Sequence, residues 1–398
     1  MNSVQKFGGC YLKNMKDLSA IAERIVQAHK EGDTLVVVVA AMQEIAEAMN
    51  RRAGELAGEI SEENLDMMFS AAESQTAALM AAALEKKGLA ASAVIDIRGS
   101  SLDLIDRAEG KHELEIGKIK DVIEEGKIAV VAGFQGIGKY GAEDVQGRYG
   151  AAATAVAIAA GLACDCQLYG NTKGIYTREP AEEGSVIEKI SYEEAMELIM
   201  LGNSDLESRA IELAKAFGVK IYIGPVLEEG KNGGTTIMDR NLIVQEAAVT
   251  GITASDDIVV YTLKGIPTAG DRIAELFELL GDLEVNIDMI SQQACGENCC
   301  AVSFSCSKEK IADIDKAFEG NQRMRDLEIS KQDDLCLISL VGVGMASHVG
   351  VASKVFGVLA RQNIHHYNIT TSEISISAAI DGTQKSRAIV ALSEAFRL

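Results

Sequence analysis

Lys6-Phe7-Gly8-Gly9 is a segment whose residue types could bind an anion. Consecutive glycines let the main chain approach a phosphate closely, and a lysine beside them would supply positive charge. Two later segments also carry glycines and a cationic side chain: Gly147-Arg148-Tyr149-Gly150-Ala151-Ala152 and Gly170-Asn171-Thr172-Lys173-Gly174-Ile175-Tyr176-Thr177. A surface lysine before a tight turn gives the same first pattern, so that segment alone is a weak signal.

The eight cysteines lie mostly in apolar runs, which is typical of reduced, buried thiols. Two groups place thiols close together in the sequence, Cys164-Asp165-Cys166 and Cys295…Cys299-Cys300. Neither group has the paired CxxC or Cys/His spacing that a zinc site needs. We therefore expect buried structural cysteines rather than a metal or redox site.

Composition argues against several classes of protein. The net charge of −21 disfavours nucleic acid and anionic membranes as partners. No stretch approaches ~20 consecutive apolar residues, so we expect no membrane span. The first residues lack the pattern of a signal peptide, which predicts a cytoplasmic protein. A length of 398 residues suits two or three domains.

Short apolar strands alternate with helical patterns over about the first 245 residues. Residues 34–40 contain a continuous valine run, which is typical of a strand buried on both faces. Residues 4–7 and 128–132 are further strands that lead into glycines. The alternation predicts an α/β domain around a mainly parallel sheet, with ligands at the carboxyl ends of the strands.

An internal repeat follows a break rich in glycine and charge at residues 228–234. Each copy reads strand, glycine loop, helix and strand, followed by a further strand and a last helix; the loops are Gly265-Ile266-Pro267 and Gly342-Val343-Gly344. We predict two βαββαβ units in tandem, residues 250–330 and 331–398, after a first domain of residues 1–245. A glycine loop that opens a helix offers backbone N–H groups to a carboxylate.

These motifs resemble those of the aspartate kinase family along the whole chain. The closest matches follow the family patterns GVGM, H.GVA and TSEIKIS: Val341–Met345, Ser347–Ala352 and Thr371–Ser377. The resemblance implies an amino acid kinase domain followed by two ferredoxin-like ACT units, which sense small molecules. It also implies transfer of the γ-phosphoryl group of ATP, with Mg²⁺, to the side-chain carboxylate of aspartate, in the lysine, threonine and methionine pathway.

The resemblance assigns roles in catalysis to three residues. Lys6 would contact the phosphates. Glu73, in Ser70-Ala71-Ala72-Glu73, matches the acid of the family's SAGE segment and would meet the substrate ammonium. Arg148 matches the arginine of GRGGSD and would clamp a substrate carboxylate. A solvated helix glutamate and a surface ion pair are the alternative interpretations of Glu73 and Arg148.

The resemblance also implies a nucleotide site. Gly8 and Gly9 would let the backbone approach the phosphates, and Lys173 and Tyr176 lie in the segment that matches the family's nucleotide loop. We expect no protein-bound metal beyond the Mg²⁺ of the nucleotide.

Several family residues are replaced in this chain. KFGGTS becomes KFGG followed by Cys10-Tyr11, SAMG becomes AAMQ, GRGGSD becomes GRYGAA, TDVDG becomes GNTKG, and LHPRS becomes LESRA. The loop at residues 181–184 is acidic and would repel a triphosphate. Loss of one positioning or charge-stabilising group commonly costs ~10²–10³ in rate, so several losses in one cleft predict poor catalysis.

The C-terminal repeat retains candidate effector-binding groups. The expected effector is an amino acid, lysine or threonine by family resemblance, and the expected assembly is a homodimer through the ACT units. His365 and His366 are expected at an interface or surface rather than on a metal. The candidate residues are Gly270, Asn286, Asp288, Ile290, Gln293, Ser347 and His348.

Three functions remain open from the sequence. The overall resemblance implies an aspartate kinase. The replaced residues favour a catalytically silent amino-acid-binding regulator, with an intact aspartate kinase as a partner. The rebuilt loops at Cys10-Tyr11 and Tyr149 would also suit a kinase for another small acid.

Overall fold

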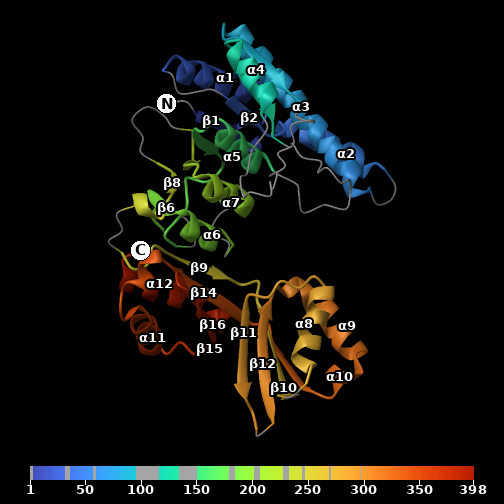
Figure 1. Ribbon diagram of the computed structural model, residues 1–398, viewed down its shortest axis with the longest axis vertical. Helices are drawn as coiled ribbons and strands as arrows, with labels where there is room; N and C mark the ends of the chain where they lie inside the picture. Colours follow the sequence, from blue (N-terminus) through green and yellow to red (C-terminus); the bar gives the residue numbers. More distant parts are fainter. Residues whose placement is uncertain are drawn as a thin grey trace, which may run out of the picture. The chain divides into compact units, whose positions relative to one another are not determined.

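Runs of β-branched residues form the centre of a large sheet in the computed structural model of this chain (Figure 1). The structure describes residues 3–31, 36–56, 60–95, 116–133, 150–178, 184–200, 207–226, 233–243, 247–268, 270–296 and 298–398. The chain divides into two compact units, one of Met1–Ile175, Val186–Ile199 and Ser204–Val244 and the other of Tyr176–Ser185, Met200–Asn203 and Gln245–Leu398. In the described residues, no helix is long and apolar enough to cross a membrane.

The first unit contains an eight-stranded sheet of order β3-β4-β2-β1-β5-β7-β8-β6. Every pair from β3 to β7 is parallel, and β7 and β8 are antiparallel. All residues of β2 and β4 are buried, as a sheet covered on both faces requires. The strands are β1 (Ser3–Phe7), β2 (Val36–Val39), β3 (Ala91–Val94), β4 (Ile128–Ala132), β5 (Asp165–Tyr169), β6 (Lys189–Ser191), β7 (Ile221–Gly224) and β8 (Thr235–Met238).

Helices cover this sheet. α1 and α3 contribute to a core with Phe7, Val37 and Val130, whereas α5 packs against β1, β2 and β5. Because successive strand residues face opposite sides, Lys6 lies on the side away from Phe7. The helices are α1 (Met15–Lys30), α2 (Gln43–Gly54), α3 (Glu62–Lys86), α4 (Gly117–Glu124), α5 (Ala151–Gly161), α6 (Tyr192–Met200) and α7 (Ser208–Phe217).

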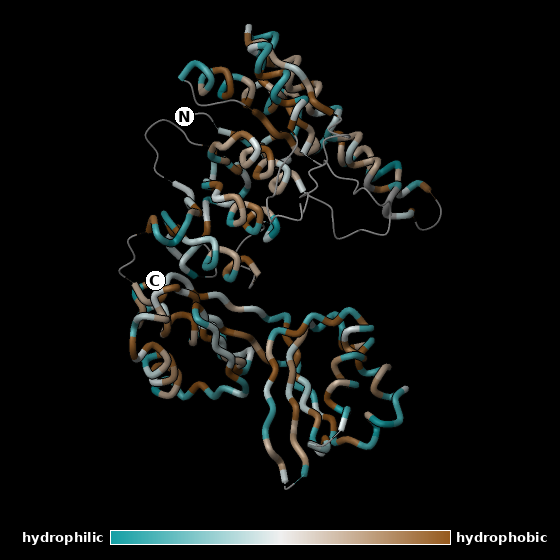
Figure 2. The backbone as a smooth tube through the Cα atoms, viewed as in Figure 1, coloured by the Kyte–Doolittle hydropathy of each residue, from teal (hydrophilic) through white to brown (hydrophobic). Residues whose placement is uncertain are grey.

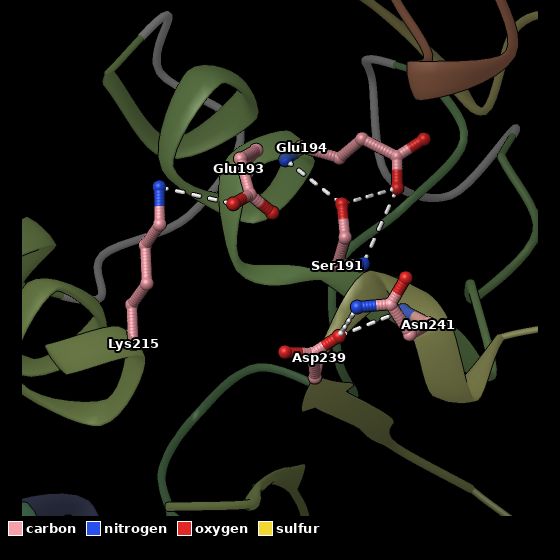
Figure 3. A network of polar contacts seen from close by, with 6 residues as sticks. All are labelled: Ser191, Glu193, Glu194, Lys215, Asp239 and Asn241. Atoms are coloured by element: carbon pink, nitrogen blue, oxygen red, sulfur yellow. Dashed lines mark hydrogen bonds and ion pairs between the residues drawn. The ribbon is translucent and has the colours of Figure 1, made fainter. Parts of the chain in front are cut away.

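A capping box joins β6 to α6 (Figure 3). The Ser191 hydroxyl donates to Glu194 Oε2 at 2.7 Å, and the Glu194 N–H donates to Ser191 Oγ at 3.3 Å. Lys215 of α7 pairs with Glu193 at 2.9 Å. These contacts satisfy the first N–H groups of α6 and tie α6 to α7.

The second unit contains two four-stranded sheets with helices packed on them. The sheets have the orders β11-β12-β10-β13 and β15-β16-β14-β9. The strands are β9 (Gly251–Ser255), β10 (Val259–Pro267), β11 (Met289–Ala294), β12 (Cys299–Cys306), β13 (Glu328–Gln332), β14 (Leu335–Val341), β15 (His366–Thr371) and β16 (Ser375–Asp381). The helices are α8 (Arg272–Asp282), α9 (Ile311–Gly320), α10 (Gln322–Arg325), α11 (Val351–Arg361) and α12 (Lys385–Phe396).

β9 pairs with the second of these sheets and not with the first. It is antiparallel to β14, with Ser339 opposite Thr253. The expected range of the first ACT unit, 250–330, includes β9, yet this strand pairs with the sheet formed by β14, β15 and β16. The physical reason is that all of β14 is buried, and both of its edges need hydrogen-bond partners. β16 pairs with one edge and β9 with the other.

The two C-terminal sheets share a small core. Residues from both contribute to it: Ile258, Val260, Met289, Leu335, Leu337 and Ala379. Figure 2 shows hydrophobic residues along the strands and on one side of the helices, as expected for amphipathic elements over buried sheets. The predicted α/β class, with a mainly parallel sheet followed by two ferredoxin-like units, is confirmed.

Candidate active site

The carboxyl ends of the central parallel strands are held together by main-chain hydrogen bonds. Gly8 N–H donates to the Tyr169 carbonyl at 3.1 Å, joining the ends of β1 and β5. Gly133 N–H donates to the Val39 carbonyl at 2.9 Å, joining the ends of β4 and β2. Ligands of open parallel sheets bind at this edge, so it is the candidate site.

The Lys6 amino group lies over the glycine turn that follows β1. A Cβ built on Gly8 would be 3.6 Å from Lys6 Nζ and 3.6 Å from Cys10 Sγ. Burial raises the pKa of the Cys10 thiol, and the nearby Lys6 charge opposes this shift. Cys10 therefore remains a neutral thiol beside the ammonium, where the family has a hydroxyl.

Glu73 lies on α3 on the side that faces the loop after β2. It is 8% exposed. Three residues later on the same helical face, the Thr76 hydroxyl accepts the Met42 N–H at 2.8 Å. The same loop also lies against the glycine turn after β1: a Cβ built on Gly9 would be 3.3 Å from the Ala41 carbonyl oxygen. The structure thus places Glu73 and Lys6 in segments that meet at this loop.

The first turn of α5 begins at the same edge of the sheet. A Cβ on Gly133, after β4, would overlap the side chain of Ala151. Ala152, where the family has the aspartate of GRGGSD, is 3% exposed. An apolar methyl group therefore occupies the position from which a carboxylate would orient the acceptor or the phosphate-binding lysine.

The carboxylate of Glu207 lies against the start of α5. A Cβ on Gly150, the N-cap of this helix, would overlap the Glu207 carboxylate. The N-terminus of a helix carries partial positive charge and free N–H groups, which attract anions. Glu207 is the N-cap residue of α7, and the family has histidine there. The sequence showed the replacement, but only the fold places the acid at α5.

Tyr11 extends the rebuilt loop after β1. Its hydroxyl accepts the Val226 N–H at 3.1 Å, and it packs with the core that contains Phe7. Tyr222 donates its hydroxyl to the Gly233 carbonyl at 2.9 Å. Burial, and secondly the proximity of Tyr11, raises the pKa of Tyr222 to about 12. These two phenols anchor the segment after β7, so Tyr11 has a structural role that serine could not fill.

Three further residues were predicted for the site, Arg148, Lys173 and Tyr176. Arg148 lies outside the described residues. Lys173 is exposed in the first unit, whereas Tyr176 belongs to the second unit. In the described chain, no group of three or more His, Cys, Asp and Glu side chains could hold a metal ion.

The predicted effector residues of the first C-terminal sheet lie on and before its edge strand. Asn286 and Asp288 are exposed just before β11, and Ile290 and Gln293 are exposed on it. Desolvation, and secondly the charge of Asp257, raises the pKa of Asp288. Gly270 has a φ of +111° two residues before α8, a conformation that favours glycine.

Ser347 and His348 follow the short 3₁₀ helix Val343–Ala346 of the second sheet. The Ser347 hydroxyl donates to the Gly344 carbonyl at 3.1 Å, and His348 Nδ1 lies 2.8 Å from the same oxygen. One carbonyl therefore orients both side chains, and both remain exposed.

The sequence and the fold match an established class of protein. Residues 1–225 match the amino acid kinase family, and residues 338–396 match an ACT domain. The aspartokinase of Bacillus sp. (strain MGA3) is 32% identical over 400 residues, covering 99% of this chain and 97% of that relative.

Two structures of E. coli aspartokinase III share the fold. The R-state structure, in complex with aspartate and ADP, has a TM-score of 0.69 and 17% identity over 100% of both chains. The T-state structure, in complex with lysine and aspartate, has a TM-score of 0.69 and 17% identity over 99% of both chains. This chain belongs to the aspartate kinase family.

Proposed function

We propose that this chain is an amino-acid-sensing member of the aspartate kinase family that has lost efficient phosphoryl transfer. The observation that carries the proposal is the position of Glu207. Its carboxylate lies at the start of α5, beside the site where Ala152 replaces an aspartate. The site has gained an anion where an anionic substrate would bind and has lost a carboxylate that would orient the reaction.

The charge balance supports this proposal. Phosphoryl transfer depends on positive charge and donors around the phosphate and on a firmly held acceptor. A carboxylate about 4 Å from a phosphate charge costs roughly 1–4 kcal/mol, depending on the local dielectric. The Cys10 thiol is a weak donor compared with the hydroxyl it replaces. Lys6 therefore faces the site with fewer cooperating groups than the family reaction uses.

An active aspartate kinase is the second candidate. Two observations favour it, namely the Lys6 amino group over Gly8 and the buried position of Glu73 on α3. In this case Lys6, Gly8 and Gly9 would hold the phosphates of ATP, and Mg²⁺ would arrive bound to those phosphates. The Glu207 carboxylate at the start of α5 and the replaced residues of the nucleotide loop disfavour binding of a triphosphate.

The sensing function rests on the C-terminal unit. Backbone N–H groups at the glycine-containing loop before α8 and polar groups along β11 suit an amino acid with its carboxylate and ammonium. Lysine, present in the E. coli aspartokinase III complex, and threonine are the effectors to test first. A homodimer through these units, acting alone or on an intact aspartate kinase, is the expected assembly.

Two measurements on the full chain separate the candidates. Calorimetry with MgATP measures nucleotide binding, and hydroxylamine trapping measures acyl phosphate formed from aspartate. We expect no ATP binding at millimolar concentration and a rise in melting temperature with lysine or threonine. Aspartate-dependent acyl phosphate that disappears in Lys6→Ala would refute the silent function and establish the kinase. The absence of any amino-acid-dependent thermal shift would refute the sensing function.

A further inference from the structure

Two thiols face each other at the tip of the hairpin formed by β11 and β12. The sulfur atoms of Cys295 and Cys299 are 3.1 Å apart. Cys295 N–H donates to the Cys299 carbonyl at 3.0 Å, and the next pair along the ladder is Ala294 opposite Cys300. The antiparallel register therefore sets Cys295 directly across from Cys299.

The backbone geometry suits a covalent bond between these sulfurs. Directly opposed residues in a hydrogen-bonded antiparallel pair have Cα atoms about 5.5 Å apart. Disulfides span Cα separations of roughly 4.4–6.8 Å. The turn also leaves room for the sulfur of Cys299. A Cβ at position 296 would lie only 2.9 Å from this sulfur, and Gly296 has none. A bond could form here without rearrangement of either strand.

The surroundings single out this pair among the eight cysteines, all of which the structure describes. Cys295 is exposed and Cys299 is half-buried, whereas Cys166, Cys300, Cys306 and Cys336 are buried. The expectation of buried structural cysteines is therefore wrong for Cys295. Oxidation requires thiols that small reagents can reach.

The two thiols also differ in acidity. The hydrogen bond with Cys299, and then the Gly265 backbone, lowers the pKa of Cys295. The same contact with Cys295, and then burial, raises the pKa of Cys299. Burial raises the pKa of Cys306 to about 11 and that of Cys336 to about 12, so these thiols stay protonated. The thiolate is the reactive form, and Cys295 is also the more exposed of the two thiols, which makes it the attacking group.

We propose that Cys295 and Cys299 form a reversible intrachain disulfide with a small-molecule disulfide as the oxidant. The Cys295 thiolate attacks one sulfur of the oxidant, its S–S bond breaks, and one thiolate leaves. The Cys299 thiolate then attacks Cys295 in this mixed disulfide and releases the second thiolate. The two thiol protons pass to the two released thiolates, so the chain is oxidised by two electrons and the oxidant is reduced to two thiols.

The bond would act on the irregular part of β10, where the register with β12 shifts between Leu263 and Ile266. The Gly265 backbone contacts the sulfur of Cys295, and this contact changes when that sulfur enters a disulfide. Gln293 lies two residues before Cys295 on β11. Formation of the disulfide itself does not depend on the proposed sensing function, but a change in amino-acid binding on oxidation would link the two.

The test uses the full chain with oxidised glutathione as the probe. After quenching and denaturation, alkylation should count two fewer of the eight thiols, and peptide mapping should find Cys295 linked to Cys299. Dithiothreitol should restore all eight. Cys164→Ser is the matched control, since Cys164 is half-buried and belongs to the other unit, and it should retain the cross-link.

Single variants identify the attacking thiol. Cys299→Ser should accumulate a glutathione adduct on Cys295. Cys295→Ser should form the adduct on Cys299 more slowly, because Cys299 is half-buried whereas Cys295 is exposed. Eight free thiols after oxidation, or a cross-link that survives in Cys295→Ser, would overturn the proposal.

Discussion

Glu207→Gln removes one negative charge from the start of α5 and preserves the size of the side chain. The carboxylate of Glu207 overlaps the position of a Cβ on Gly150, so it lies within the first turn of the helix, where the dipole acts. An anion there contributes about 0.3–1 kcal/mol at an exposed site. We expect the free energy of unfolding to fall by this amount.

The same substitution should strengthen binding of a phosphate anion at this edge of the sheet. At ~4 Å, the repulsion between the carboxylate and a phosphate is worth roughly 1–4 kcal/mol. Because Glu207 is exposed, the lower half of that range applies, about 1–2 kcal/mol. With 1.4 kcal/mol equal to a factor of ten, affinity should rise about 5- to 30-fold.

Calorimetry with inorganic phosphate measures this gain for wild type and variant. The gain should shrink as added salt reduces the Debye length from about 10 Å at 0.1 M to about 3 Å at 1 M. Glu212→Gln is the matched control, since Glu212 also lies on α7 and pairs with Arg209 at 2.8 Å. Gly150→Ala tests the same contact in a second way, because the added Cβ would displace the Glu207 carboxylate. The φ of −66° at position 150 is one that alanine adopts readily.

Equal anion affinity in wild type, Glu207→Gln and Glu212→Gln would refute the idea that Glu207 closes the site. A gain in both glutamine variants would indicate a general effect of net charge. A gain confined to Glu207→Gln and Gly150→Ala would support a local effect at α5.

Three further predictions concern stability. Ser191→Ala should lower the free energy of unfolding by about 1–3 kcal/mol in urea titrations, because the buried Glu194 loses two hydrogen bonds, one accepted by its carboxylate and one donated by its backbone N–H. Ser191→Thr should retain most of this stability, and equal losses in the two variants would contradict the capping box. Thr76→Val should lower the free energy of unfolding by about 1–3 kcal/mol, because the buried Met42 N–H, 2.8 Å from the Thr76 hydroxyl, would lose its acceptor. Thr76→Ser should lower it less, and an unchanged free energy of unfolding in Thr76→Val would contradict this account. The Lys385 hydrogen bond lowers the pKa of Asp256 below its ordinary 3.8, so its stabilisation is present above that pH and is lost as the pH falls through the folded-state pKa. The Asp256 side chain is 62% exposed, so Asp256→Asn should cost at most about 1 kcal/mol at neutral pH and nothing in strong acid, and a loss independent of pH would refute the ion pair.

The fold class was predictable because it depends on local patterns. The four valines of β2 are buried throughout, as their uninterrupted apolar run predicted. The partner of β9 was not predictable, because Thr253 pairs with Ser339, far away in the sequence. A repeat in the sequence predicts which strands and helices exist. Which sheet edge β9 joins depends instead on which buried strand still lacks a hydrogen-bond partner, here β14.

The candidate sites divide in the same way. Residue types alone reveal that Ala152 and Cys10 replace polar groups of the family, since a methyl group or a thiol cannot do the chemistry of a carboxylate or a hydroxyl in any fold. The opposition of Cys295 and Cys299 needed the hairpin register, because a four-residue separation brings two sulfurs together across a turn or along a helix but not along a single strand.

The sequence by itself determined the family, the order of elements and the loss of individual chemical groups. The tertiary structure decided where the remaining groups lie. Lys6 reaches over Gly8 because β1 ends in a turn hydrogen-bonded to β5, and Glu207 reaches α5 because the two helices α5 and α7 pack together. Electrostatic effects depend on distance, and distances between segments far apart in the chain are set by packing rather than by residue type.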